Sequence, residues 1–393
     1  MIVLFGISIV VTLCYAILIA KLNMGLKSLK LFTPMPAAAT IKLSIIVPFR
    51  NEERHLKVLM QSLIQQDYPK ELFEIILIDD ASTDASVGIV NDFIETHTEF
   101  KITLIQNKRK SNSPKKDAIS GAIQVANHNW IVCTDADCIT HPKWLSTISS
   151  YIQKHKTINM IVGPIAVFPE EKKISFLKRI QLDFEQLDVL SLQATTAAAF
   201  GLQQPLLNNG ANLAFTKTAF NVVNGYEGNN HLASGDDHFL LEKFIRWNTR
   251  SVHYLKSKTA IVTTFAQLSW SDLFKQRKRW AAKTLSFTNK NAKLLAFLIF
   301  LENSLLVITT LSTIIYSVYV FCSIQNFLFL GVIWLLKWIL DRIVLRRAAG
   351  FFSFDIPLYR YIVVAFIYPW FNVAIAFSAL RGGYHWKDRF FKR

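Results

Sequence analysis

The sequence predicts an α/β domain with a mostly parallel sheet, flanked by transmembrane α-helices. Two observations lead to this fold class: short β-rich runs alternate with helical stretches in the middle of the chain, and apolar stretches lie at both ends. With 393 residues, 51% hydrophobic and 18% charged, the chain has room for two or three domains and is not disordered. The net charge of +16 suits an anionic membrane surface, a phosphorylated substrate or nucleic acid.

The N-terminal segment 1–22 is predicted to be a transmembrane anchor, followed by a linker over 23–42. Its first twenty residues carry no charge, which is enough for one helix across a hydrocarbon core of roughly 30 Å. Lysines follow at once, beginning with Lys21, so the positive-inside rule places the rest of the linker in the cytoplasm. A signal peptide cleaved near residues 37–39 is the alternative, but no Lys or Arg precedes the apolar stretch.

The middle segment, residues 43–270, is predicted to form the α/β domain. Apolar runs of strand length occur at 43–47, 73–78, 102–105 and 130–133, and stretches with helical spacing at 53–66, 84–94 and 115–127. Continuous apolar strands that alternate with helices are typical of a parallel sheet covered on both faces. Ligands of such sheets bind beyond the carboxyl ends of the strands.

The C-terminal part is predicted to be a membrane region. Residues 271–290 form an amphipathic interface helix, and 291–393 hold two or three spans followed by a basic tail. The uncertain span is 327–345, because it carries Lys337, Asp341 and Arg342 and could cross the bilayer or lie at its surface. Two spans would keep the tail on the side of the α/β domain, and this is the arrangement we expect.

Acidic residues follow the predicted strands. Asp80 comes after the strand at 73–78, and Asp135 and Asp137 come directly after the strand at 130–133. Such a carboxylate pair suits Mg²⁺ or Mn²⁺ bound together with substrate phosphates, although a solvated loop would look similar. Asp236 and Asp237 precede a predicted helix, where they could cap its N-terminus or supply a carboxylate base.

Several other chemistries lose their support. The chain contains no GxGxxG, GxxxxGK, HExxH or GxSxG motif, which disfavours Rossmann dinucleotide, P-loop, zincin and serine-hydrolase sites. Its four cysteines show no metal-ligand spacing. The basic run 275–279 could bind nucleic acid, but its place between an α/β domain and a membrane helix favours an interface role, so no nucleic-acid partner is expected.

Five sequence motifs, taken in order, resemble those of a known protein family. The order IIVPFRNEE, DDASTD, TDADC, GDD and QRKRW, over about residues 43–285, resembles the membrane-bound family 2 glycosyltransferases, whose GT-A fold has a Rossmann-like sheet. Within the family the chain is most similar to processive polysaccharide synthases and ceramide glucosyltransferases, and the tail WKDR resembles the ends of lipid glucosyltransferases. The resemblance implies an integral protein of a bacterial-type inner or plasma membrane, with its catalytic domain in the cytoplasm.

The resemblance also implies roles for single residues. The implied catalytic residues are a general base with a supporting acid and a cation for the leaving diphosphate: Asp237, Asp236 and Arg279. The implied donor-binding residues are Pro48, Asn51, Glu52, Asp80, Lys116, Asp135, Asp137 and Gln276. Asp137 and Asp135 would hold Mg²⁺ or Mn²⁺. The implied acceptor-binding residues are Trp280, Asn209, Gly210 and Asn212.

Two positions depart from the family pattern. The usual Glu-Asp at the base is Asp236-Asp237 here, and the usual Gly-Lys is Lys115-Lys116. The implied activity is inverting transfer of a hexose or N-acetylhexosamine from a nucleotide diphosphate sugar, with UDP favoured, to a lipid-borne or glycan acceptor. Membrane lipids and accessory subunits are the further partners. Processive polysaccharide synthesis and a catalytically silent membrane scaffold are the alternative interpretations.

Overall fold

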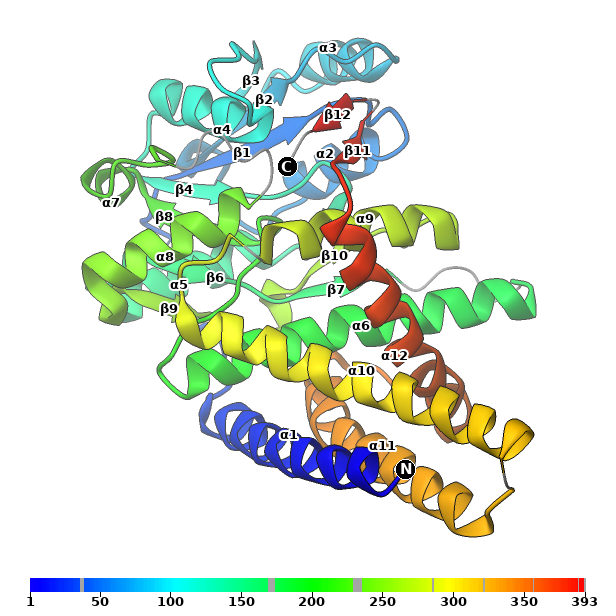
Figure 1. Cartoon of the computed structure of the whole chain (residues 1–393). Coiled ribbons are helices and arrows are strands. Elements are labelled where there is room, and N and C mark those ends of the chain that lie inside the picture. The colour runs from blue at the N-terminus through cyan, green and yellow to red at the C-terminus, as the bar shows by residue number, and fades with distance from the viewer. Residues whose placement is uncertain are drawn as a thin grey trace.

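The computed structural model of the chain describes residues 1–35, 39–168, 174–228, 235–284, 286–320, 322–355, 357–387 and 389–391. Part of the alternative cleavage site at 37–39 and Asp388 of the tail lie outside these residues. An α/β domain sits on a group of long helices, and the chain ends beside the domain (Figure 1).

The α/β domain contains a seven-stranded sheet with the order β3-β2-β1-β4-β8-β6-β9. Its strands are β1 (Leu43–Phe49), β2 (Phe73–Asp79), β3 (Ile102–Gln106), β4 (Trp130–Cys133), β6 (Met160–Val162), β8 (Leu213–Thr216) and β9 (Val252–Tyr254). Only β8 runs antiparallel to its neighbours β4 and β6. A smaller sheet contains β5 (Cys138–Thr140), β10 (Val262–Thr264) and β7 (Ile165–Val167). The prediction of a mostly parallel α/β sheet is therefore confirmed.

Helices cover both faces of the large sheet, which explains why its central strands are largely apolar. One hydrophobic core joins alternate strand residues such as Ile45 and Ile75 to α2 (Leu56–Ile64), α3 (Ser86–Thr96) and α5 (Trp144–Lys154). The other core joins Ile46 and Ile76 to α4 (Pro114–Val125), α6 (Phe176–Gly201) and α8 (Asp236–Asn248). Successive strand residues point to opposite faces, so both sets are buried. The short α7 (Lys217–Val222) follows β8.

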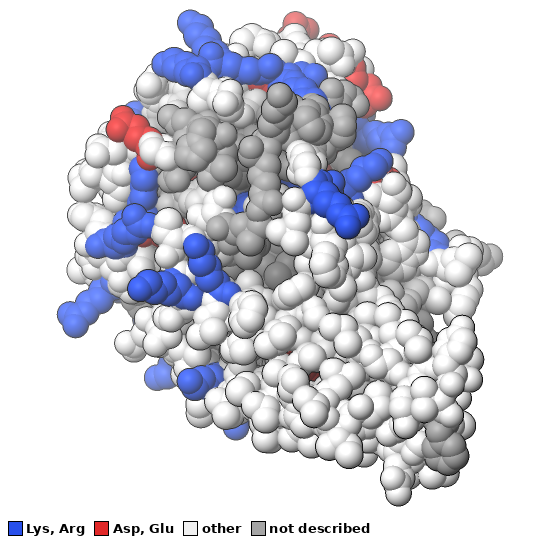
Figure 2. Space-filling view, in the orientation of Figure 1, with Lys and Arg blue, Asp and Glu red and all other residues white. Residues whose placement is uncertain are grey.

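Among the described residues, three helices are long and apolar enough to cross a membrane: α1 (Ile2–Ser28), α10 (Lys290–Tyr319) and α12 (Leu358–Leu380). The helix that follows α10, α11 (Ile324–Phe352), corresponds to the uncertain span. In Figure 2, Lys and Arg gather over the α/β domain, whereas the surface over the long helices is almost free of charged side chains. This division of the surface fits a domain that stands on a membrane.

Two charged residues of α11, Lys337 and Asp341, are paired within the helix group. Lys337 donates to Asp341 on the same helix, and Tyr15 of α1 donates to the other carboxylate oxygen of Asp341, both over 2.5 Å. Thr12 of α1 donates to Glu302 of α10 over 3.1 Å. Buried charges among apolar helices are costly unless they are paired, so these contacts allow α11 to pack between its neighbours.

The path of the chain returns the tail to the α/β domain. The Nζ of Lys258 lies 3.0 Å from the Oγ of Ser353, just after α11, so the α10–α11 pair leads away from the domain and comes back. Arg360, near the start of α12, pairs with Asp183 of α6, and the residues after α12 contact the domain. The tail therefore lies against the α/β domain, while its side of the membrane stays a prediction.

Candidate active site

The site is built at the carboxyl ends of β1, β2 and β4. Asp80 directly follows β2, and its N–H donates to Phe49 O at the end of β1. Asp135 and Asp137 follow β4, whose neighbour in the sheet is β1. Strands that end at one edge of a parallel sheet bring their following residues together. The three carboxylates predicted from separate motifs therefore share one edge of the sheet.

The loops after β1 and β2 support each other through direct bonds. The backbone N–H of Asn51 donates to Ser82 Oγ over 3.0 Å, and the Asn51 side chain accepts from the Thr83 N–H over 2.8 Å. Asn51 and Ala81 both adopt positive φ values, 50° and 57°. Such backbone is unusual outside glycine and is held by its surroundings, which is common at functional sites. Glu52 is thereby fixed at the rim of the same edge.

Lys115 connects two of the acidic motifs. Its ammonium group lies 2.7 Å from Asp135 and 3.4 Å from Asp236 at the start of α8. Burial lowers the pKa of Lys115, but the carboxylates of Asp135 and Asp236 outweigh burial and raise it above its usual value. The neighbouring Lys116, to which the resemblance assigns a donor contact, is buried with its Nζ 5.2 Å from the centre of the Phe239 ring.

Asp137 is a buried carboxylate close to two other carboxylates. Burial, followed by the charges of Asp135 and Glu52, raises the pKa of Asp137 to about 6. A cation would relieve this repulsion, so the pair Asp135 and Asp137 fits a divalent metal ion. No cluster of three or more Asp, Glu, His or Cys metal ligands occurs in the described parts of the chain. A metal ion here would need further oxygen ligands, which substrate phosphates can supply.

Asp237 occupies the first turn of α8 and is held as a carboxylate. The helix begins at Asp236 after Gly235, whose φ of 89° and close contact with Phe239 leave no room for a side chain. The ammonium group of Lys283 lies 3.4 Å from the Asp237 carboxylate. Burial acts to raise the pKa of Asp237, but Lys283 and Lys115 outweigh burial and hold it below its usual value. The first helical turn also favours negative charge.

The predicted acceptor loop reaches this carboxylate pair. A Cβ placed on Gly210 would lie 3.3 Å from a carboxylate oxygen of Asp236, so the backbone of Gly210 passes directly beside it. Asn212 is 3% exposed and uses its amide to hold the scaffold, since it bonds to Trp144 and to the carbonyls of Pro164 and Ala260. Asn209 accepts from the N–H of Asn212 over 3.0 Å. Of these three, only Gly210 contacts the acidic pair.

The motif QRKRW lies on α9 (Trp270–Thr284). Arg277 is buried, donates to Asp188 of α6 over 2.5 Å, and lies 4.2 Å from the centre of the Trp280 ring. Gln276 accepts from the Arg277 guanidinium group. Arg279 and Trp280 are half-buried. Because Lys283 on the same helix pairs with Asp237, the motif helix is docked against the candidate base.

Three cations at the site were not predicted from the sequence. Asp80 accepts from Arg109 over 2.8 Å and from Arg389, near the C-terminus, over 2.5 Å. Lys387 lies 2.7 Å from Glu52. The excess of Lys and Arg in the tail was visible in the sequence, but no local pattern indicates a contact between residues 389 and 80.

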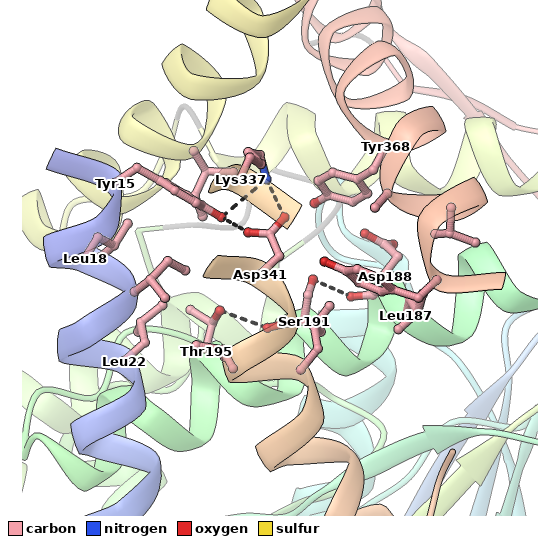
Figure 3. A pocket seen from close by; sticks show the side chains of 17 residues that line it. Tyr15, Leu18, Leu22, Leu187, Asp188, Ser191, Thr195, Lys337, Asp341 and Tyr368 are labelled. Atoms are coloured by element: carbon pink, nitrogen blue, oxygen red, sulfur yellow. Dashed lines mark hydrogen bonds and ion pairs between the residues drawn. The ribbon is translucent and has the colours of Figure 1, made fainter. Parts of the chain in front are cut away.

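A cavity of about 100 Å³ lies below the motif helix, between α6 and the long helices α1, α11 and α12. Figure 3 shows that Leu18, Leu22 and Leu187 form part of its apolar wall and that Asp188 also lines it. Asp188 is the partner of Arg277 on α9. The cavity is therefore joined to the motif helix through one buried ion pair.

Comparisons with known proteins bear on the family and on the fold. Residues 44–220 match the family model for glycosyl transferase family 2. The mannosyltransferase PcManGT of Pyrobaculum calidifontis, solved with GDP-Man and Mn²⁺, superposes with a TM-score of 0.59 at 17% identity, covering 91% of this chain and 98% of that one. This likeness shows the GT-A fold.

Curated relatives match shorter segments. The poly(ribitol-phosphate) beta-N-acetylglucosaminyltransferase TarS of Staphylococcus aureus is 28% identical over 122 residues, which are 31% of this chain and 21% of TarS. The putative glycosyltransferase EpsE of Bacillus subtilis is 30% identical over 129 residues, or 33% of this chain and 45% of EpsE. The matches thus span less than half of either relative. Residues 44–220 therefore match glycosyltransferase family 2, within a domain that has the GT-A fold, and the described residues include three candidate membrane helices.

Proposed function

We propose that the chain is a membrane-bound, metal-dependent, inverting glycosyltransferase. It moves a hexose or N-acetylhexosamine from a nucleotide diphosphate sugar, with UDP as the favoured nucleotide, to a lipid-borne acceptor. Its α/β domain faces the cytoplasm, where the lysines after α1 would keep it under the positive-inside rule. The observation that carries this proposal is the position of Asp237, a buried carboxylate beside Gly210 and in reach of the motif helix.

Asp237 is the general base of the proposed reaction. Lys283 and Lys115 hold its pKa below the usual value although burial opposes them, so it is ready to accept a proton at neutral pH. The acceptor hydroxyl gives its proton to Asp237 as its oxygen attacks the anomeric carbon. The bond from that carbon to the diphosphate oxygen breaks on the opposite side, and its electron pair leaves with the nucleotide. One displacement of this kind inverts the anomeric centre.

The negative charge of the leaving diphosphate needs stabilisation. Asp135 and Asp137 would hold a divalent ion, which supplies Lewis-acid stabilisation of the diphosphate when it is bound. Arg279 and Gln276 on α9 are the residues proposed to bind the diphosphate from the other side. The relatives support a nucleotide-sugar donor, since one bears the name of a beta-N-acetylglucosaminyltransferase and another was solved with GDP-Man and Mn²⁺.

The cavity below α9 supports a lipid-borne acceptor. Its wall is formed by membrane helices and is largely apolar, as a hydrocarbon chain requires. Its polar end contains Asp188, which holds Arg277 of the motif helix. A lipid seated there would present its head group towards α9, and Trp280 of that helix is the residue proposed to stack on the acceptor.

Release of nucleoside diphosphate tests the proposal directly. Purified protein in Mn²⁺ and a membrane-lipid extract should release UDP or GDP from one of a panel of nucleotide sugars. Asp237→Asn should lower this rate about a hundredfold or more, since a general base is removed, while donor binding persists. Asp92→Asn, an exposed position on α3, is the matched control and should act like the unmodified protein.

The products of the transfer reaction distinguish the remaining interpretations. A single glycolipid supports transfer to a lipid, and a product of many sugar units indicates a processive synthase. Absence of nucleotide release with every donor and acceptor mixture would favour the silent scaffold and contradict the proposal.

A further inference from the structure

The last residues of the chain form a hairpin over the candidate donor site. Strand β11 (Tyr384–Trp386) pairs antiparallel with β12 (Arg389–Phe391), and β11 contacts α9. In Figure 1 the hairpin lies beside β1 and α2 and follows a short segment after the upper end of α12. It thereby bridges the motif helix and the loops that follow β1 and β2.

Two cations of the hairpin bind three predicted donor residues. The Nζ of Lys387 donates to a carboxylate oxygen of Glu52 over 2.7 Å and to Asn51 O over 3.0 Å. Arg389 donates to a carboxylate oxygen of Asp80 over 2.5 Å and to Asp80 O over 3.1 Å. Side-chain exposure is only 13% for Glu52 and 7% for Asp80, so the contacts are well shielded from water.

These cations change the charge balance of the site. Five carboxylates pair there with five Lys or Arg side chains: Glu52, Asp80, Asp135, Asp236 and Asp237 with Arg109, Lys115, Lys283, Lys387 and Arg389. Removal of the hairpin leaves these five carboxylates, together with Asp137, with three of these cations. A diphosphate would then approach a site with excess negative charge, which opposes its binding.

The two side chains also keep N–H groups available for a ligand. An ammonium group has three N–H donors and a guanidinium group five. The bonds of Lys387 and Arg389 to described residues use two donors of each group.

We propose that the C-terminal hairpin is part of the donor site, where Lys387 and Arg389 bind the diphosphate of the nucleotide sugar. This assignment rests on the proposed function, because it needs a diphosphate donor at the edge formed by β1, β2 and β4. The ion pairs with Glu52 and Asp80 hold the two cations in place before the donor arrives. Preorganised cations of this kind bind a charged ligand with less loss of conformational freedom. The opposite role, a plug that the donor must displace, predicts the opposite result.

Nucleotide binding to shortened and substituted chains distinguishes the two roles. Titration calorimetry with UDP and with GDP, in Mn²⁺, compares the full-length protein with a chain that ends at Gly382. We expect the shortened chain to bind the nucleotide more than tenfold more weakly. Lys387→Gln and Arg389→Gln should each cost about tenfold, and uridine, which has no diphosphate, should be much less affected. Arg381→Gln, an exposed position before the hairpin, is the matched control.

Unchanged or tighter UDP binding by the shortened chain, in a protein that still unfolds at its normal temperature, would overturn the assignment. Equal losses for uridine and UDP would also overturn it, because the cations would then act on the nucleoside or on the fold. If the full-length protein binds neither UDP nor GDP, the proposed function itself is wrong and this assignment with it. Weaker UDP binding by the point variants alone supports the assignment even if the shortened chain is unstable.

Discussion

Lys115 lies between carboxylates that belong to different motifs, Asp135 after β4 and Asp236 at the start of α8. Without it, these two carboxylates and that of Asp237 would repel one another. The family pattern has glycine where this chain has Lys115, so a departure from the pattern supplies a bridge between the proposed metal and base residues. The supporting acid is one methylene shorter than usual, and Lys115 reaches it at 3.4 Å.

Glu74 is a buried carboxylate whose contribution to stability depends on pH. It accepts from Ser44 Oγ over 2.7 Å and from both the N–H and the side chain of Asn127, and it pairs with Lys101 at 2.9 Å. Burial acts to raise the pKa of Glu74, but the hydrogen bonds from Ser44, Asn127 and Lys101 lower it to about 2. The carboxylate therefore stabilises the fold above the unfolded-state pKa, about 4.3, and less as the pH falls towards 2.

Glu74→Gln should lower the free energy of unfolding by about 2 kcal/mol at pH 7, because charge-assisted bonds to a buried group are lost. The difference from the unmodified protein should shrink as the pH falls from about 5, where the unfolded state begins to bind the proton. Denaturant unfolding followed at several pH values measures both effects. Glu71→Gln, an exposed position just before β2, should change neither, and a pH-independent deficit in Glu74→Gln would contradict the explanation.

At the scale of elements, α1 is attached to the α/β domain through a close contact with α6. A Cβ on Gly25 would lie 2.2 Å from Ala198 O, and one on Gly201 would lie 1.9 Å from Gly25 O. The hydroxyl of Ser28 donates to Gly201 O over 2.6 Å. Small residues allow two helix backbones to approach this closely, as is common between membrane helices. The anchor and the domain are therefore packed against each other as well as linked.

Gly25→Val should push α1 away from α6 and lower the stability of the detergent-solubilised protein by about 2 kcal/mol, since backbone atoms must move. Thermal unfolding followed by loss of monodisperse protein measures the change. Gly6→Val on the same helix is the matched control, because a Cβ there has no atom within 4 Å among the described residues. Equal unfolding temperatures for the two variants would show that the contact does not support the fold.

The elements that the sequence predicted are those with a local signal. Apolar runs predicted β1, β2, β3 and β4, and helical spacing predicted α2, α3 and α4, with ends that moved by at most three residues. The long helix α6 and the antiparallel strand β8 were not predicted, because their burial depends on neighbours far along the chain. The same reason hid Arg389, whose partner Asp80 is 309 positions away. The charges of α11 left its position in the membrane open, because the sequence does not show that Tyr15 of α1 binds Asp341.

At the scale of the whole molecule, the membrane helices are joined to the proposed reaction centre by a chain of contacts. The cavity between α1, α6, α11 and α12 contains Asp188, which binds Arg277 of α9. On the same helix, Lys283 binds Asp237. A ligand in the cavity and a donor at the sheet edge would thus contact opposite sides of one helix. This arrangement favours a reaction between a lipid that stays in the membrane and a soluble nucleotide sugar.

A larger side chain in the cavity should therefore impair transfer to the acceptor without weakening donor binding. Ala365 lines the cavity from α12, and Ala365→Phe should occupy the space proposed for the lipid chain. We expect glycolipid formation from a membrane-lipid extract to fall at least tenfold, because the acceptor loses its apolar contacts, while UDP binding stays unchanged. Val363→Phe, on the same helix but 37% exposed and outside the cavity, is the matched control. Full glycolipid formation by a folded Ala365→Phe protein would mean that the acceptor approaches Asp237 by another route.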